Sequence, residues 1–131
     1  MRRSGADEAA DCETEHMRHI VTASEAVEIV RPGLRIHAYS PEDAFASAST
    51  IAVDGEHHRI HSTHSDRIYL VQSGSGWFEI DGVTKRVGAD DVVFLPRETG
   101  YSYGGKMNLF LVHAPGFLDG TDVELPAIDE S

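Results

Sequence analysis

The sequence has a single cysteine, Cys12, among its 131 residues. No disulfide can therefore form within the chain, and the cysteine usage gives no sign of an oxidising compartment. No apolar run is long enough to span a bilayer, and the first residues lack the apolar segment of a secretory signal. We therefore expect a cytoplasmic protein with no membrane partner.

Basic residues are also scarce. There are 11 lysines and arginines against 22 aspartates and glutamates, which gives a net charge of −11. Such a charge disfavours binding to nucleic acid or to an anionic membrane surface. Ten of the acids lie in the first 15 and the last 16 residues, so most of the charge is at the two ends. We expect one domain over residues 17–118, between flexible acidic tails at 1–16 and 119–131.

A convincing long helix is missing as well, and the dominant patterns are those of strands. Apolar, β-branched and aromatic runs at 34–39, 49–53, 67–71, 77–80, 83–87, 92–95 and 108–113 predict strands. Turn residues separate them, at Asp54-Gly55, at 73–76 and at the hairpin dipeptide Asp81-Gly82. About nine or ten short strands with this punctuation predict an all-β fold of the double-sheet jelly-roll type.

Residues 55–74 hold four of the eight histidines and run into the strongest strand pattern. Within them the spacing of a glycine, His61, Thr63, Arg67 and a second glycine resembles the first motif of the cupin superfamily. That motif reads glycine, histidine, histidine, glutamate, glycine. Residues 90–101 are similar to the second cupin motif, in which an apolar run leads to a proline, here Pro96, and then to a histidine, here Tyr101.

The resemblance implies the cupin double-stranded β-helix, a jelly-roll barrel that holds one small molecule in its mouth. Small cupins often pair through their first strands, so it also implies a homodimer, with residues 17–30 as the candidate interface. Of the four metal ligands of metal-binding cupins, this chain keeps one, His61. Because Arg67 is a fixed cation that repels a divalent metal, we expect no metal and no other cofactor.

The motif positions place His61, Thr63, Arg67 and Tyr101 in the pocket. His61 titrates near neutrality and is the predicted catalytic base, with the Tyr101 phenol as the acid. The pair resembles the histidine and tyrosine of metal-free nucleotide-sugar epimerases. Arg67 would hold an anionic oxygen of the substrate. The other predicted substrate-binding residues are Arg59, Thr63, Tyr69 and Tyr103.

Strand alternation from His61 adds a prediction that can be checked, namely that His57, Arg59 and Thr63 share its face.

The sequence thus predicts a metal-independent isomerase, cyclase or lyase acting on a small anionic or carbonyl-bearing metabolite. Two alternatives remain open. One is a module that binds a small molecule without catalysis. The other is a metal-dependent cupin in which a bulge brings His57, His61 and His64 together around zinc, iron or nickel.

Overall fold

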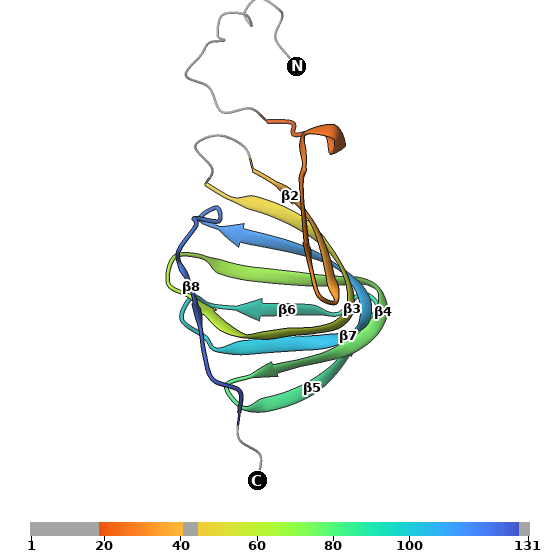
Figure 1. The fold of residues 1–131 in the computed structure, drawn as a ribbon, viewed down its shortest axis with the longest axis vertical. Coiled ribbons are helices and arrows are strands. Elements are labelled where there is room, and N and C mark those ends of the chain that lie inside the picture. Colours follow the sequence, from red (N-terminus) through yellow and green to blue (C-terminus); the bar gives the residue numbers. More distant parts are fainter. Residues whose placement is uncertain (1–18, 41–44, 129–131) are drawn as a thin grey trace, which may run out of the picture.

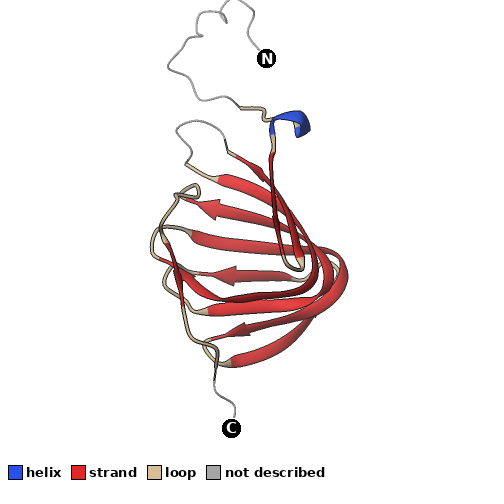
Figure 2. Ribbon diagram, viewed as in Figure 1, coloured by secondary structure: helices blue, strands red, loops and turns tan. Residues whose placement is uncertain are grey.

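The computed structural model describes residues 19–40 and 45–128, and nearly all regular structure in them is β-strand (Figure 2). The one helical element is a 3₁₀ turn at Ala23–Glu25. The eight strands are β1 (Val27–Arg31), β2 (Leu34–Tyr39), β3 (Ser47–Ser62), β4 (Asp66–Ile80), β5 (Val83–Gly88), β6 (Val92–Leu95), β7 (Tyr101–Ala114) and β8 (Asp122–Glu124). The predicted all-β class is confirmed. No helix in these residues is long and apolar enough to cross a membrane.

All strands pair antiparallel in one sheet of order β1-β2-β3-β7-β4-β5, with β6 on β4 and β8 on β3. Within the described residues the hydrogen bonds do not close the sheet into a barrel, because β1 and β5 stay at opposite edges of the order. The long strands β3, β4 and β7 instead bend together, and the sheet curls into an open cup (Figure 1).

A row of glycines allows this bend. Gly55 of β3, Gly105 of β7 and Gly76 of β4 are register partners across the sheet. Gly105 has φ 129°, and a Cβ there would lie 2.5 Å from the Gly76 Cα, so the backbones approach in a way that side chains would prevent. The turns predicted at Asp54-Gly55 and at 73–76 are therefore wrong. The chain bends there and the strand continues, which leaves eight strands instead of nine or ten.

The hairpin predicted at Asp81-Gly82 is confirmed. It joins β4 to β5, and both residues have positive φ, 49° and 90°, as a tight type I′ turn requires. The predicted C-terminal tail differs from expectation, because β8 lies within it and pairs with β3. The sheet thus extends beyond residue 118. The predicted N-terminal tail, 1–16, lies outside the described residues.

The concave face of the sheet carries the core. Alternate residues of β3, β4, β6 and β7 are buried, whereas their neighbours on the convex face are more exposed. Four aromatic rings, those of Tyr69, Phe78, Tyr101 and Tyr103, pack edge-on or stacked, with centroids 5.0 to 6.3 Å apart. These rings form the floor beneath the candidate site.

Candidate functional site

A β-bulge in β3 decides which of its residues face the cup. His57 pairs with Tyr103, but the next pair is Ile60 with Tyr101, so three steps along β3 match two along β7. The extra residue reverses the alternation. Ile60 is buried on the concave face, and His61 beside it points to the other face. The predicted common face of His57 and His61 is therefore wrong.

The bulge removes three predicted site residues from the cup. His61 is half-buried on the side opposite Tyr101 and is the register partner of Val123, so it cannot exchange a proton with a ligand inside the cup. Thr63 is exposed, and its hydroxyl donates to the Thr121 carbonyl at 3.1 Å. Arg59 also lies on the convex face, where it has another partner.

That partner is Glu79, whose Oε1 lies 3.2 Å from the Arg59 Nε. Glu79 further accepts hydrogen bonds from the Ser102 hydroxyl at 2.9 Å and the Gly82 backbone N–H at 2.7 Å. Burial raises the pKa of Glu79, but these three donors outweigh it and hold the pKa below its usual value. The network is complete, and Arg59 stabilises the convex face instead of binding substrate.

Beneath the cup lies a second network, built around the buried Arg67. Its guanidinium donates to the Tyr101 hydroxyl at 2.7 Å and to the Asp122 carboxylate. The Tyr69 and Tyr101 hydroxyls lie 2.6 Å apart. Burial raises the pKa of both phenols, so they stay protonated at neutral pH. Arg67 stays charged, because the tyrosines and Asp122 outweigh the effect of its burial and raise its pKa.

His57 lies over this floor. Its ring stacks on Tyr103, with centroids 5.0 Å apart, and its Nδ1 lies 2.6 Å from the His58 carbonyl oxygen. A carbonyl can only accept, so Nδ1 carries the proton and Nε2 keeps a lone pair. Burial lowers the pKa of His57, and this outweighs the hydrogen bond to the His58 carbonyl, which raises it. The ring is therefore neutral at pH 7 and can act as a base.

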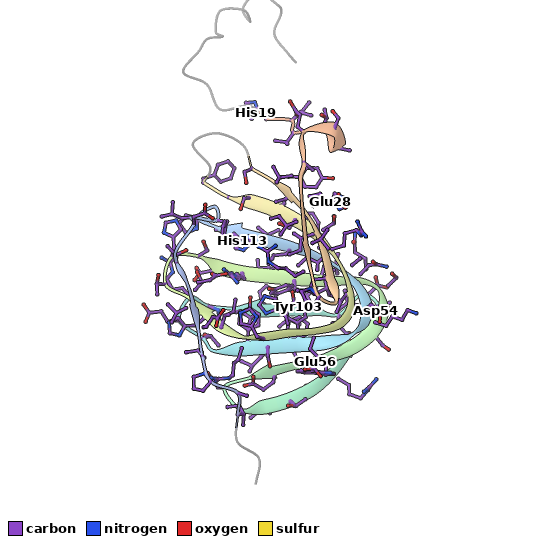
Figure 3. The ribbon with its side chains drawn as sticks, in the orientation of Figure 1. His19, Glu28, Asp54, Glu56, Tyr103 and His113 are labelled. Carbon is purple, nitrogen blue, oxygen red and sulfur yellow. The ribbon has the colours of Figure 1, made fainter. Side chains whose placement is uncertain are left out.

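Above the floor the cup contains a cavity of about 460 Å³, a size suited to a small metabolite. Its apolar wall comes from the β1–β2 hairpin and the centre of the sheet, namely Ile29, Leu34, Ile36, Ile51 and Leu111. Its polar groups come from all sides, namely Arg31, Ser47, Ser49, Glu56, His57, His58, His113 and Asp122. Tyr103 and His113 both lie within the curve of the sheet in Figure 3, with Asp54 at its bend.

His113 is a site residue that the sequence analysis missed. It is 6% exposed, lines the cavity, and its Nδ1 has no hydrogen-bond partner. Burial, with a smaller effect from Arg67, lowers its pKa to about 3. The Phe117 ring meets it edge-on at 5.5 Å. A neutral imidazole with an unused nitrogen at a cavity wall is suited to hydrogen-bonding a ligand.

The structure buries the predicted tyrosines deeper than expected. Tyr69, Tyr101 and Tyr103 are each 1% exposed and form the floor, and none of them is among the residues that line the cavity. Arg67 also lies below the cavity and is held by Asp122. Arg67, Tyr69 and Tyr101, which the motif spacing and strand alternation placed in one pocket, thus lie together in the structure. Asp122, which the sequence patterns assigned to the C-terminal tail, connects this cluster to the cavity wall.

No three histidine, cysteine, aspartate or glutamate side chains among the described residues lie close enough together to hold a metal ion. The alternative ligand set His57, His61 and His64 is therefore not assembled. The bulge turns His61 away from His57, and His64 follows β3, where its backbone N–H donates to the Ser62 hydroxyl at 3.2 Å.

No family model and no curated protein matches the sequence. Solved structures do match its fold. Streptomyces PAC13 with uridine, in a variant with one histidine replaced by glutamine, is 24% identical, with a TM-score of 0.78 over 86% of this chain and 94% of that chain. Another Pac13 structure, described as that of a unique nucleoside dehydratase, is 25% identical, with a TM-score of 0.77 and the same coverage.

Two further structures extend the likeness. KdgF from Halomonas sp. is 17% identical, with a TM-score of 0.65 over 78% of this chain and 96% of that chain. An RmlC-like cupin from Shewanella frigidimarina is 19% identical, with a TM-score of 0.63 over 75% and 91% of the two chains. These matches confirm the fold that the two sequence motifs implied. The chain therefore has the fold of these small cupin structures.

Proposed function

We propose that the cup binds a small, neutral, hydroxylated molecule of the nucleoside class and eliminates water from it, with His57 as the catalytic base. The observation that carries this proposal is the His57 ring, which lines the cavity with its Nε2 lone pair unused while Nδ1 is held by the His58 carbonyl. This assignment replaces His61, which points away from the cup.

The charges around the cavity favour a neutral ligand over the anionic one expected from the sequence. Arg67 is committed to Asp122 and Tyr101 and is not free to hold a substrate anion. The acidic Glu56 and Asp122 line the cavity along with the basic Arg31. Carboxylates, serine hydroxyls and neutral imidazoles bind hydroxyl groups well, and the apolar wall suits the flat face of a ring.

The Pac13 structures support this ligand class. They hold uridine in variants with one histidine or one of two tyrosines replaced. Those two tyrosines are separated along their chain by the same number of positions as Tyr69 and Tyr103. The replaced histidine precedes the first tyrosine by one position more than His57 precedes Tyr69. The spacing thus matches His57 far better than His61.

The chemistry needs a hydrogen on a carbon made acidic by a neighbouring carbonyl, with a hydroxyl on the next carbon. His57 takes this proton on Nε2, the electrons of the C–H bond form the double bond, and the C–O bond breaks. The imidazolium then gives its proton to the leaving oxygen, so that water departs and His57 is again neutral. One residue serves as base and acid, and the buried Tyr101 is not required as the acid.

The hydrogen-bond network around Arg67 has a positioning role in this proposal. Tyr69 contacts the Tyr101 hydroxyl, Tyr101 accepts a hydrogen bond from Arg67, and Arg67 holds the Asp122 carboxylate at the cavity wall. A carboxylate fixed there can accept a hydrogen bond from a substrate hydroxyl and orient the sugar ring toward His57.

The test is a mass-spectrometric screen of nucleosides and their carbonyl derivatives for loss of one water. The matched variants are His57→Gln and His61→Gln, each of which removes one imidazole of β3. We expect His57→Gln to lower kcat/KM by about 10²-fold or more, and His61→Gln to leave it unchanged. Tyr101→Phe should have a smaller effect, because it acts through Arg67.

Four outcomes would count against the proposal. Full turnover by His57→Gln would remove the assigned base, and a loss confined to His61→Gln would restore the original assignment. A product of unchanged mass would indicate an isomerase or cyclase. Saturable binding of a nucleoside without turnover would indicate the non-catalytic module, which remains the second candidate because the same cavity serves both.

A further inference from the structure

Removal of a proton from the carbon beside a carbonyl moves negative charge onto the carbonyl oxygen. A hydrogen-bond donor that is already aimed at this oxygen lowers the barrier, and loss of one such donor typically costs about 10²–10³ in kcat. The buried cation and phenol of the site are not placed for this task. Arg67 is held by Asp122, and neither Arg67 nor Tyr101 lines the cavity. The donor must therefore come from the cavity wall.

His113 reaches this wall from a different limb of the folded sheet than His57 does. Strand β7 carries both Tyr103, the register partner of His57, and His113, the register partner of Ser47. The strand bends between them at Gly105. Both histidines line the same cavity of about 460 Å³. A small ligand that fills the cavity can therefore contact both imidazoles at once.

The two imidazoles differ in which nitrogen carries the proton. The Nδ1 of His57 donates to the His58 carbonyl, so its Nε2 keeps the lone pair. The Nδ1 of His113 is sealed from solvent and has no hydrogen-bond partner among the described residues. Because a buried N–H without an acceptor is especially costly, Nδ1 of His113 holds the lone pair and Nε2 the proton. His113 thus presents a donor to the cavity, where His57 presents an acceptor.

The electrostatic surroundings of His113 suit an oxygen that gains negative charge. Burial, with a smaller effect from Arg67, lowers the pKa of His113 to about 3, so the ring is neutral at pH 7 and keeps its single proton. A neutral imidazole can polarise a carbonyl without protonating it. Arg67 is the register partner of His113 and acts on it, whereas at His57 the effects of Arg67 and Asp122 have opposite signs. The potential beside His113 is therefore positive.

We infer that His113 is a second catalytic residue, whose Nε2–H donates to the substrate carbonyl and stabilises the enolate that forms when His57 removes the neighbouring proton. The inference rests on the proposed function. The C–H proton moves to His57, and its electron pair forms a C=C bond while the carbonyl oxygen becomes O⁻. When the C=O bond forms again, the C–O bond of the leaving hydroxyl breaks, and His57 returns the proton so that water departs. His113 keeps its own proton throughout.

Initial rates of water loss, measured on the carbonyl-bearing nucleoside identified in the screen, test this role in the full chain. His113→Phe keeps a flat ring in the wall without a donor, and it should lower kcat by about 10²–10³-fold with little change in KM. His113→Gln places an amide N–H near the position of Nε2 and should recover at least about tenfold of that loss. The matched control is His37→Phe, which should keep the wild-type rate because His37 does not line the cavity.

Two measurements separate this role from a structural one. Uridine has no carbonyl on its sugar, so its Kd by calorimetry should agree within about threefold between the wild type and His113→Phe. Histidine ¹⁵N NMR of the wild type at pH 7 should show the His113 proton on Nε2 and the His57 proton on Nδ1. The NMR measurement does not depend on how well the variants fold.

Full turnover by His113→Phe, together with loss of turnover by His57→Gln, would overturn the inference and leave the proposed function standing. A proton on Nδ1 of His113 would also overturn it. So would a loss of uridine affinity in His113→Phe as large as the loss of kcat, since the contact would then be the same in the ground state. Full turnover by His57→Gln would remove the proposed function, and the role of His113 with it.

Discussion

Acid should destabilise the protein through His113. The side chain is 6% exposed, and burial lowers its pKa to about 3, whereas an unfolded histidine binds its proton near pH 6.5. Between these values the unfolded chain holds more protons, so the free energy of unfolding falls as the pH falls. One proton is worth about 1.4 kcal/mol per pH unit, and from pH 6.5 to pH 4.5 the cost is about 2–3 kcal/mol.

The assay is urea unfolding at pH 7 and at pH 4.5 for the wild type, His113→Gln and His19→Gln. Carboxylates and His57 contribute their own pH dependence, but they are common to all three proteins. His113→Gln should therefore lose about 2–3 kcal/mol less than the wild type on acidification. His19→Gln, which removes an exposed ring, should behave as the wild type does. If His113→Gln lost as much unfolding free energy between pH 7 and pH 4.5 as the wild type does, His113 would not be a buried neutral imidazole.

Three further substitutions test the floor and the bend. Asp122→Asn leaves the buried Arg67 cation without its carboxylate. It should lower the free energy of unfolding by about 1–3 kcal/mol in chemical denaturation, because the partial exposure of Asp122 limits the loss. An unchanged free energy would show that water replaces the carboxylate. Tyr69→Phe removes a 2.6 Å hydroxyl contact and should cost about 1 kcal/mol by the same measurement, and a stabilised variant would contradict that contact. Gly105→Ala should lower Tm by about 4 °C or more, because residue 105 has a φ of 129° and a Cβ there would strike Gly76. Gly88→Ala is the matched control, and it should change Tm little because a Cβ at Gly88 meets open space.

Much of the fold could be predicted from local patterns. Alternation over Leu34–Tyr39, the apolar run Val92–Leu95 and the Asp81-Gly82 turn all depend on neighbours in the sequence, and each is found where expected. The bend at Gly55 could not be predicted in this way. A glycine can end a strand or let it fold over, and only its register partners on β4 and β7 decide between the two.

Prediction from neighbouring residues in the sequence was limited in the same way at the candidate site. The motif spacing found Arg67 and Tyr101, which do lie together in the structure. It chose His61 over His57 because it assumed regular alternation, and one bulged residue reversed the faces. Asp122 lay in a segment that resembled a solvated tail by its acidity, and only its approach to Arg67 from far along the chain reveals its role.

Histidine NMR of the ¹⁵N-labelled protein at pH 7, with and without saturating uridine, tests the central claim most directly. The account predicts that the His57 ring is neutral with its proton on Nδ1, that its Nε2 resonance shifts when uridine binds, and that the His61 resonances stay in place. A shift of the His61 ring with no change at His57 would contradict the account.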